Sequence, residues 1–379
     1  MSSEPDLNRT ALYANHLAAN GRMVPFAGWS MPVQYEGVLS EVKAVRNNVG
    51  IFDVSHMGRL RIEGLTCGQL LERILTFPVK NLNHGRARYG FILTPEGGVI
   101  DDVIVYQQST DDGARGQYTL ICNASNRETV ISWIDENVAD SPDILVTDFT
   151  EESVMIALQG PKAGAIADEL CVGEHKPSTI RPFSSISQSM RLQNLDSVVD
   201  VFIGRTGYTG EDGFEIIADA KFGSAVWTTL QIRGAAPCGL GARDVLRLEA
   251  GLRLHGSDMD ISKSPLEAGL DRFVNMQSHD FIGRKALTIQ QTRGLDNILV
   301  GFRLLGPGIP RHQHTLFKGS KQIGEVTSGT YSPTLDTGIG MGYVSMEYST
   351  PGDQINVNIR GRIVEAEIVE LPFYHRQKK

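Results

Sequence analysis

The sequence predicts an α+β protein with a separate all-β domain at its C-terminal end. The first 294 residues contain apolar patterns typical of both strands and helices, but these do not alternate as regular βαβ units. After about Leu295 the pattern changes to alternating strands linked by Gly and Pro turns, without a helical period among them. The strands expected there span 297–305, 321–327, 340–344, 354–360 and 362–369. We therefore expect a small barrel or sandwich over 295–379.

Length, composition and charge place the chain among soluble globular proteins. The 379 residues allow two or three domains, and 41% hydrophobic residues suffice for real cores. A net charge of -8 argues against a broad contact with nucleic acid or an anionic membrane. The sequence shows no transmembrane run and opens with polar and acidic residues, so we expect an intracellular, cytoplasmic protein. The four widely spaced cysteines lack a Cys-x-x-Cys pair, which predicts buried thiols.

The N-terminal part is expected to begin with two short helices. Apolar residues recur at helical spacing from Thr10 to near Gly21, and a second helix begins at Ser40 and ends at 48–50. Between them, 23–35 is too broken by Pro and Gly for a helix and too apolar for a loose loop, which predicts ordered coil. Residues 51–62 then read as extended chain.

The next region predicts a three-stranded meander that leads into an amphipathic helix. Two strands, 89–93 and 97–106, form a hairpin, and a third strand follows the turn Asp111-Asp112-Gly113. A capping-box pattern at 125–128 precedes the apolar helical positions up to Val138. That third strand spans 118–123. Other strands are expected at 154–158, 198–203 and 214–217, and other helices at 69–75, after Pro161 and at 222–230.

Two adjacent carboxylates, Asp101 and Asp102, stand inside the second strand of the hairpin, after the turn Gly97-Gly98. Because strand side chains alternate, each is expected on an otherwise apolar face, Asp102 together with Ile100 and Tyr106. An ionised acid there is costly unless it is hydrogen-bonded, paired with a cation or kept for chemistry. The alternative is a solvated strand end beside a turn, which paired acids next to Gly-Gly often mark.

Residues 205–215 form a loop with three glycines that ends in Glu215, at the start of the next strand. The loop lacks the lysine and the helix start of a phosphate-binding loop, so we exclude nucleotide phosphate binding. The alternative to a ligand-binding loop is a tight, decorated hairpin.

Residues 239–247 place Arg243 and Arg247 one helical turn apart on one face. An arginine near a helix start gains nothing from the helix dipole, so an acidic partner is expected, and ordinary ion pairing with Asp244 or Glu249 is the alternative. His56 has no neighbour at metal-ligand spacing apart from Asp53. We therefore expect a structural histidine and no metal site.

Taken in order, these motifs resemble those of the aminomethyltransferases, the T-proteins of the glycine cleavage system. The resemblance includes Phe-Asp-Val-Ser-His-Met-Gly at 52–58 and Gly-Gly-Val-Ile-Asp-Asp at 97–102. The matching stretches are 25–35, 52–58, 97–102, 205–215, 239–244 and 324–333. They span nearly the whole chain, and six ordered motifs are far more specific than any single one.

The resemblance implies three lobes around a central tetrahydrofolate channel. Residues 1–294 would form two interleaved α+β lobes, the first about 1–60 with 152–260 and the second 61–151 with 261–294. Residues 295–379 would form a C-terminal β-barrel, in agreement with the change of pattern near Leu295.

The resemblance also implies the reaction. The aminomethyl group on the lipoyl arm of H-protein is split: its carbon passes to tetrahydrofolate as methylenetetrahydrofolate, ammonia leaves, and dihydrolipoyl H-protein remains. Tetrahydrofolate would be a co-substrate, with no metal, nucleic acid or membrane involved. A local basic rim that includes Arg22, Arg86 or Arg88 would steer the carrier toward this acidic protein. A eukaryotic source would place the protein in the mitochondrial matrix.

Carried over residue by residue, the resemblance places the catalytic aspartate on Asp102, which would hold the attacking folate nitrogen and stabilise cationic character there. Glu215 corresponds to the residue that reads the pterin ring, and Arg243 to a second folate contact. The residues that correspond to the channel lining are Tyr89, Tyr106, Asn123 and Tyr208. A C-terminal contact is expected at Arg376, after His375, whereas Leu252 stands where some relatives carry an aromatic channel residue.

Other classes of protein could share the folate half of such a site. A tetrahydrofolate-dependent demethylase of a small amine or sulfur compound would look similar there. A non-catalytic folate-binding relative in iron–sulfur assembly carries a Lys-Gly-Cys signature, which this sequence lacks. A pure binding partner of the lipoyl carrier would leave Asp102 idle. Assays with the lipoyl carrier and with free methylated substrates separate these classes.

Overall fold

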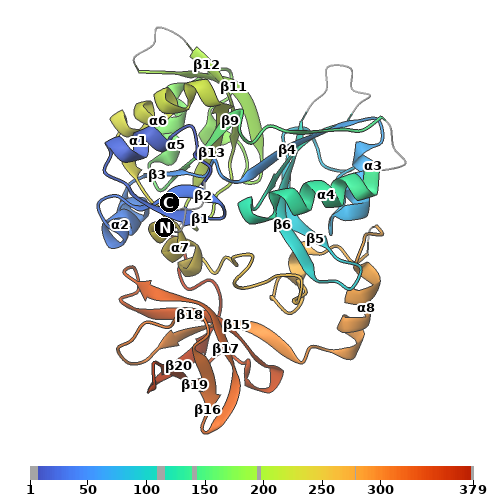
Figure 1. Ribbon diagram of the computed structural model, residues 1–379, viewed down its shortest axis with the longest axis vertical. Helices are drawn as coiled ribbons and strands as arrows, with labels where there is room; N and C mark the ends of the chain where they lie inside the picture. Colours follow the sequence, from blue (N-terminus) through green and yellow to red (C-terminus); the bar gives the residue numbers. More distant parts are fainter. Residues whose placement is uncertain (1–6, 109–115, 139–142, 194–197, 278, 377–379) are drawn as a thin grey trace, which may run out of the picture.

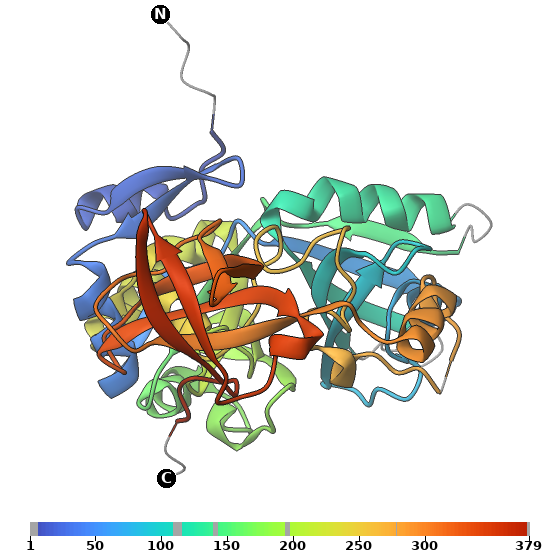
Figure 2. The ribbon, with the colours of Figure 1, turned by 90° about the horizontal axis from the view of Figure 1, so that it is seen from below.

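The computed structural model describes residues 7–108, 116–138, 143–193, 198–277 and 279–376. Its strands form two open sheets, a closed barrel and a two-stranded hairpin (Figure 1). Seen from below, the C-terminal barrel lies in front of the N-terminal sheets (Figure 2). Within these described ranges, no helix is long and apolar enough to cross a membrane. The turn expected at Asp111-Asp112-Gly113 lies outside the described residues.

The larger open sheet has the strand order β10-β11-β12-β13-β9-β3-β14. Neighbouring strands are antiparallel, except that β14 runs parallel to β3. The strands are β3 (Gly50–Asp53), β9 (Ser153–Gln159), β10 (Cys171–Val172), β11 (Ser185–Arg191), β12 (Val198–Gly204), β13 (Gly213–Asp219) and β14 (Ala236–Pro237). The helices on this side of the molecule are α1 (Tyr13–Ala18), α5 (Ala163–Leu170) and α6 (Gly223–Ile232).

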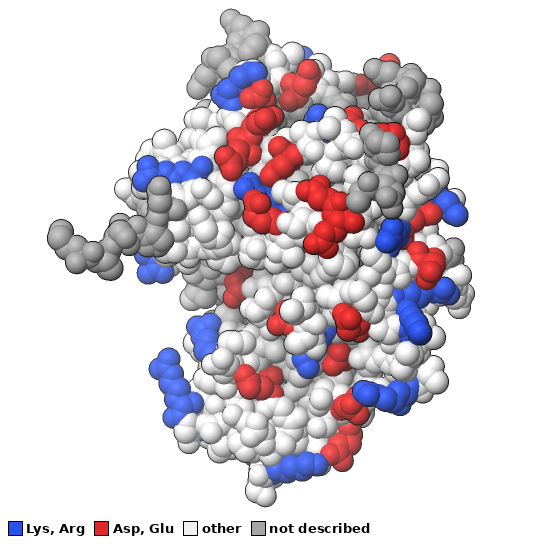
Figure 3. All heavy atoms as spheres, turned by 45° about the vertical axis from the view of Figure 1, so that its right-hand side comes forward, with Lys and Arg blue, Asp and Glu red and all other residues white. Residues whose placement is uncertain are grey.

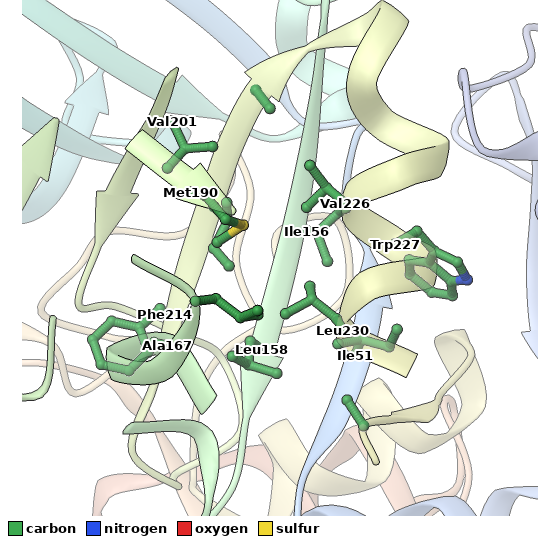
Figure 4. Packing of buried hydrophobic residues seen from close by; sticks show 14 of the residues in the cluster. Ile51, Ile156, Leu158, Ala167, Met190, Val201, Phe214, Val226, Trp227 and Leu230 are labelled. Atoms are coloured by element: carbon green, nitrogen blue, oxygen red, sulfur yellow. The ribbon is translucent and has the colours of Figure 1, made fainter. Parts of the chain in front are cut away.

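Strand β9 is buried on both faces, and its alternating side chains separate two cores. Ile156 and Leu158 pack toward the helices, where they meet Val226 and Leu230 of α6 (Figure 4). Ala157, on the other face, belongs to the core between the two sheets and stands directly opposite Glu215 of β13. The site residue Glu215 is therefore held on the inner face of this sheet by strand register.

The second open sheet has the strand order β5-β6-β7-β4-β8, all antiparallel. Its strands are β4 (Gly58–Gly64), β5 (Ala87–Leu93), β6 (Val99–Gln108), β7 (Gly116–Cys122) and β8 (Leu145–Asp148). Helices α3 (Cys67–Ile74) and α4 (Arg127–Val138) bury one face of the sheet, and η1 (Ala124–Asn126) leads into α4. The meander and the amphipathic helix are as expected, although 125–128 forms η1 and the first turn of α4 without a side-chain cap.

The chain alternates between the two sheets. It passes from β3 in the larger sheet to β4 in the smaller one through residues 54–57, and it returns through β9 after β8. Strand β4 begins at Gly58, so it pairs with the smaller sheet from two residues before the expected lobe boundary at 60. The exact division of residues 1–294 into two lobes stays a prediction.

The C-terminal strands close into a barrel in the order β15-β18-β17-β16-β19-β20, which confirms the expected all-β region. The strands are β15 (Asn297–Leu304), β16 (Thr315–Lys318), β17 (Lys321–Ser332), β18 (Thr337–Ser345), β19 (Gln354–Ile359) and β20 (Arg362–Val369). The sequence pattern missed β16, because four residues are too few to show an alternation.

Helix α7 (Leu240–Glu249) connects the parts of the molecule, since it packs against α2 (Val38–Asn47) on one side and against β17 and β18 of the barrel on the other. Helix α8 (Arg284–Arg293) lies beside the second sheet, at the right of Figure 1, and packs Leu287 against that sheet's strands β5 and β6. The remaining short helices are η2 (Pro177–Thr179), η3 (Ala220–Phe222), η4 (Asp271–Phe273) and η5 (Met346–Tyr348).

The expectation of ordered coil over 23–35 is wrong. This segment is an antiparallel hairpin of β1 (Arg22–Phe26) and β2 (Trp29–Gln34), which pair with each other and with no other named strand of the described chain. Its turn consists of Ala27 and Gly28, with φ of 48° and 80°. Two successive positive φ values are those of a tight hairpin turn whose twist matches the strands. The prolines are tolerated because a two-stranded ribbon has two open edges.

Candidate active site

A cavity of about 320 Å³ lies where the two sheets meet α7 and the C-terminal segment. Its wall is formed by β5 and β6, the residues after β7, the loop between β12 and β13, the first turn of α7, residues 250–255 and the segment Leu371-Pro372. The site residues expected from the sequence that line it are Tyr89, Asp102, Asn123, Tyr208, Glu215 and Arg243. The fold thus brings together residues that are far apart in the sequence.

Asp102 lies on the cavity side of β6, where both of its carboxylate oxygens accept hydrogen bonds. Tyr89, from the neighbouring strand β5, donates to Oδ2 at 3.0 Å, and the amide of Asn123 donates to Oδ1 at 2.8 Å. A β-bulge opposite Ile92 and Leu93 modifies the expected alternation at Ile100. Ile100 therefore packs in the core beneath α3 and α4 instead of sharing the face of Asp102.

Asp101 points away from the cavity and is completely buried. Its carboxylate accepts hydrogen bonds from the backbone N–H of Asn123 at 2.9 Å, from the Asn123 amide at 2.8 Å and from the Asn126 amide at 2.7 Å. The alternative of two solvated acids at a strand end is therefore wrong. Burial raises the pKa of both carboxyl groups above the usual range, and the charge of Asp102 raises the pKa of Asp101 further.

Glu215 is the second acid in the cavity wall and is only 8% exposed. Its Oε2 accepts a hydrogen bond of 2.5 Å from the Thr206 hydroxyl, and the Thr206 hydroxyl lies 2.6 Å from the hydroxyl of Tyr106. Among the described residues, no donor reaches its Oε1. Burial raises the pKa of Glu215. The loop 205–215 thus presents an acid to the cavity and is more than a decorated hairpin.

Tyr106 does not line the cavity. It is 1% exposed, stands behind Thr206, and packs edge-to-face on Phe202 with ring centroids 5.1 Å apart. The structure therefore connects it to the cavity through Thr206 and Glu215, whereas the resemblance placed it in the lining.

Arg243 reaches the cavity from the first turn of α7, with its guanidinium carbon 4.7 Å from the ring centroid of Tyr208. The Tyr208 hydroxyl donates to the backbone carbonyl of Arg253 and is thereby fixed in place. Within the described chain, Arg243 forms no ion pair or hydrogen bond, and the acidic partner expected for it is at longer range: Glu215 attracts its charge only from beyond ion-pair distance. Burial lowers the pKa of this guanidinium.

Arg247, one turn further along α7, has the partners that Arg243 lacks. It forms ion pairs with Asp258 at 2.6 Å and with Asp244 at 2.8 Å, and it donates to the Ser328 hydroxyl of the barrel at 2.7 Å. Ordinary ion pairing, the alternative for both arginines, thus holds for Arg247 alone.

The C-terminal segment reaches the cavity at a different point from the one expected. Leu371 and Pro372 line it, whereas Arg376 lies outside the lining and forms an ion pair of 3.7 Å with Asp212. Leu252, at the position where an aromatic residue was considered, does line the cavity.

Several lining residues were not selected from the sequence, most notably His255. Its Nδ1 lies 3.0 Å from the Asn126 amide nitrogen and its Nε2 lies 3.2 Å from the carbonyl oxygen of Val99. Because an amide nitrogen donates and a carbonyl accepts, this geometry fits the neutral tautomer with the proton on Nε2. No local motif marks His255, since its partners come from β6 and η1, more than 125 residues earlier in the chain.

His56 also lines the cavity, on the link from β3 to β4. Its ring packs edge-to-face on Phe26 of the β1–β2 hairpin, with centroids 5.6 Å apart, and burial lowers its pKa to about 3. It is therefore a neutral, packed side chain near neutral pH. Over the described ranges, no group of three or more His, Cys, Asp or Glu residues could hold a metal ion.

Comparisons with known proteins place the whole chain in one family. The GCVT N-terminal domain family matches residues 12–278, and the glycine cleavage T-protein C-terminal barrel domain family matches residues 298–375. The chain therefore belongs to the glycine cleavage T-protein family.

Individual relatives agree over their whole length. The chain is 42% identical to an aminomethyltransferase of Thermosynechococcus vestitus, over 98% of this chain and 97% of that protein. It is 43% identical to an aminomethyltransferase of Rubrobacter xylanophilus, over 98% and 95%. The crystal structure of glycine cleavage system aminomethyltransferase T from Bartonella henselae superposes with a TM-score of 0.88 at 30% identity, over 98% of this chain and 99% of that one. The chain is thus an aminomethyltransferase-type transferase enzyme.

Proposed function

We propose that this enzyme transfers the methylene carbon of the aminomethyl group on lipoylated H-protein to tetrahydrofolate. The products would be methylenetetrahydrofolate, ammonia and dihydrolipoyl H-protein. The observation that carries the proposal is the cavity itself, which exposes two acids and an unpaired arginine between two sheets and the C-terminal segment. Family membership supports the same reaction.

The polar groups of the cavity suit a reduced folate. Glu215 has one carboxylate oxygen without a donor in the described chain, and its geometry suits two adjacent N–H groups such as those of a pterin. Arg243, without a carboxylate partner, suits a carbonyl or carboxylate oxygen of the ligand. Tyr89 and Tyr208 offer aromatic surface along the same wall. Folate contacts of Tyr106 and Arg376 stay predictions, and the positions of these residues favour indirect roles.

Asp102 is the residue we assign to the chemistry. Its carboxylate is held in one orientation by Tyr89 and Asn123, and it faces the cavity. There it can take a proton from a folate nitrogen or stabilise positive charge on the carbon that is transferred. Orientation by two donors keeps the carboxylate in place without neutralising it, because a phenol and an amide carry no charge.

The carrier must reach this cavity with its lipoyl arm. On the face shown in Figure 3, acidic side chains gather in the upper part and basic ones lie mainly lower down and at the edges. Of the arginines considered for docking, Arg22 and Arg88 are exposed, whereas Arg86 donates to Pro182 and Ser184. Arg88 also lines a groove that shares Tyr89 and Phe273 with the cavity. This groove is the entrance we favour for the arm.

The test is a direct assay of both products. Aminomethylated H-protein and tetrahydrofolate are mixed with the enzyme, and ammonia and methylenetetrahydrofolate are measured together. Equal amounts of the two products would support the proposal. Turnover of a free methylated amine or sulfur compound without turnover of the carrier would instead establish a demethylase, and folate binding without either reaction would establish a binding protein.

A further inference from the structure

We propose that Asp101 and Asp102 act as one acid–base unit that carries a single proton between them near neutral pH. The inference rests on the proposed function for its role in the reaction, but the sharing of the proton is a property of the protein alone. Asp101 does not face the cavity, so in this proposal it is a positioning residue: it acts by setting the charge of Asp102.

The first argument is the bridge between the two side chains. One atom, Nδ2 of Asn123, lies 2.8 Å from Oδ1 of Asp101 and 2.8 Å from Oδ1 of Asp102. Both oxygens are therefore nearest neighbours of the same amide nitrogen. Two negative charges held this close inside a protein repel strongly, so that losing the second proton costs much more than losing the first.

The second argument is that little positive charge offsets the pair: among the described groups that interact with it, only His255 lowers the pKa of Asp102 by its charge. Among the described residues, neither carboxylate forms an ion pair with a lysine, arginine or histidine. The titratable groups that interact with the pair are Tyr89 of β5, Cys122 at the end of β7, Tyr208 of the β12–β13 loop and His255 after α7. Burial raises the pKa of the three tyrosine and cysteine groups, so near neutral pH they stay uncharged.

The third argument is the hydrogen-bond count at Asn126. Its amide nitrogen lies within 3.1 Å of three acceptors: the Ile100 carbonyl, Asp101 Oδ1 and His255 Nδ1. An amide nitrogen carries two hydrogens, so one of these contacts needs a hydrogen from elsewhere. Asp101 Oδ1 therefore competes with two other acceptors for these two hydrogens, so its negative charge is stabilised less and a proton on Asp101 is favoured.

A shared proton suits the proposed chemistry. The overall reaction moves two protons from the two folate nitrogens, one to the departing amine and one to the sulfur of the carrier arm. With one proton in place, the pair can accept a proton from nitrogen as a C–N bond forms. The pair can then donate a proton to the departing amine as the bond between the amine nitrogen and the methylene carbon breaks. The unit ends with the proton count with which it began, so it needs no other co-reactant.

The test is the titration of aspartate carboxyl carbons by NMR on the whole enzyme without substrate. We expect one carboxyl that titrates near neutral pH or above it, about three to four pH units above the exposed aspartates. That upper step should move to lower pH in D101N and in D102N, because either change removes the like charge and leaves only the effect of burial. D200N, which alters an exposed aspartate on β12, is the matched control and should keep the step.

Two results would overturn the proposal. In the first, both carboxyls titrate together with the exposed aspartates. In the second, the upper step stays at the same pH in both D101N and D102N. Either variant alone suffices if the other does not fold. In the carrier assay, D101N should also lose an alkaline decline of the single-turnover rate, which a purely structural role would leave unchanged. A failed carrier assay together with a clear upper step would refute the reaction and retain the pair.

Discussion

The cavity wall and the contact of α7 with the barrel use the same kinds of charged residue in opposite ways. At the contact, Arg247 is saturated by Asp258, Asp244 and Ser328, and Arg46 of α2 is paired with Glu249 at 2.7 Å and with Glu211 at 2.8 Å. In the cavity, Arg243 forms no ion pair with any carboxylate of the described residues. Buried charges are costly unless they are paired. A buried arginine without an ion pair, one helical turn from an arginine that has two, is therefore a candidate for binding a charged or polar ligand.

The largest effect on stability is expected from Arg247→Ala. The change leaves the completely buried Asp258 without its cation, which costs about 3–5 kcal/mol of unfolding free energy. Urea denaturation measures this loss. Arg243→Ala is the matched variant on the same helix, and it should cost much less because it breaks no ion pair of the described residues and removes only the longer-range attraction to Glu215. Equal losses would erase the distinction between the two regions.

The next largest effect is on turnover, from Asp102→Asn. The variant keeps the size of the side chain but loses its charge, so the rate should fall by roughly 10²–10³ while much of the folate affinity remains. Single-turnover release of ammonia at saturating folate measures the rate. At neutral pH, the single-turnover rate of Asp101→Asn should fall far less than that of Asp102→Asn. A normal rate in Asp102→Asn, or equal losses in the two variants, would reassign the acid.

Glu215→Ala should act on binding before turnover. The ligand donors that face the open Oε1 would lose their acceptor, and each unpaired polar group costs roughly 1–3 kcal/mol. We expect the folate dissociation constant to rise accordingly, while the rate at saturating folate falls less. Titration by calorimetry gives the dissociation constant. A variant that binds folate normally but turns over slowly would move Glu215 from recognition to chemistry.

The difference between the two regions also shows what could be read from the sequence. Local periodicity predicted the acidic hairpin and the barrel strands, because each depends on neighbours a few residues apart. The sequence pattern did not predict the β-bulge at Ile100 or the turn at Ala27, because both depend on backbone geometry that apolar periodicity does not encode. Motifs selected Asp102, Glu215 and Arg243, all of which line the cavity, but could not tell which arginine of α7 forms ion pairs.

Long-range partners account for the remaining differences. Asn126 and His255 meet across 129 residues of sequence, and Arg247 finds Ser328 across 81. Such pairs depend on how the sheets, α7 and the barrel assemble, which no local pattern reports. The position of Arg376 also depends on this assembly. The C-terminal segment lines the cavity with Leu371 and Pro372, whereas Arg376 pairs with Asp212 outside the lining.

The smallest expected effect is thermal stabilisation by tetrahydrofolate. A ligand held only by the folded cavity adds about 1.4 kcal/mol at ten times its dissociation constant, and the melting temperature rises with its concentration. Differential scanning calorimetry at increasing folate concentrations measures this rise in melting temperature. Glu215→Ala should shift the response to higher folate concentrations, whereas Arg247→Ala should lower the starting temperature and keep the same concentration dependence. If saturating folate did not raise the melting temperature of the unchanged enzyme or of Arg247→Ala, the cavity would not be the folate-binding site. The charged residues of the cavity without an ion-pair partner would then need another ligand.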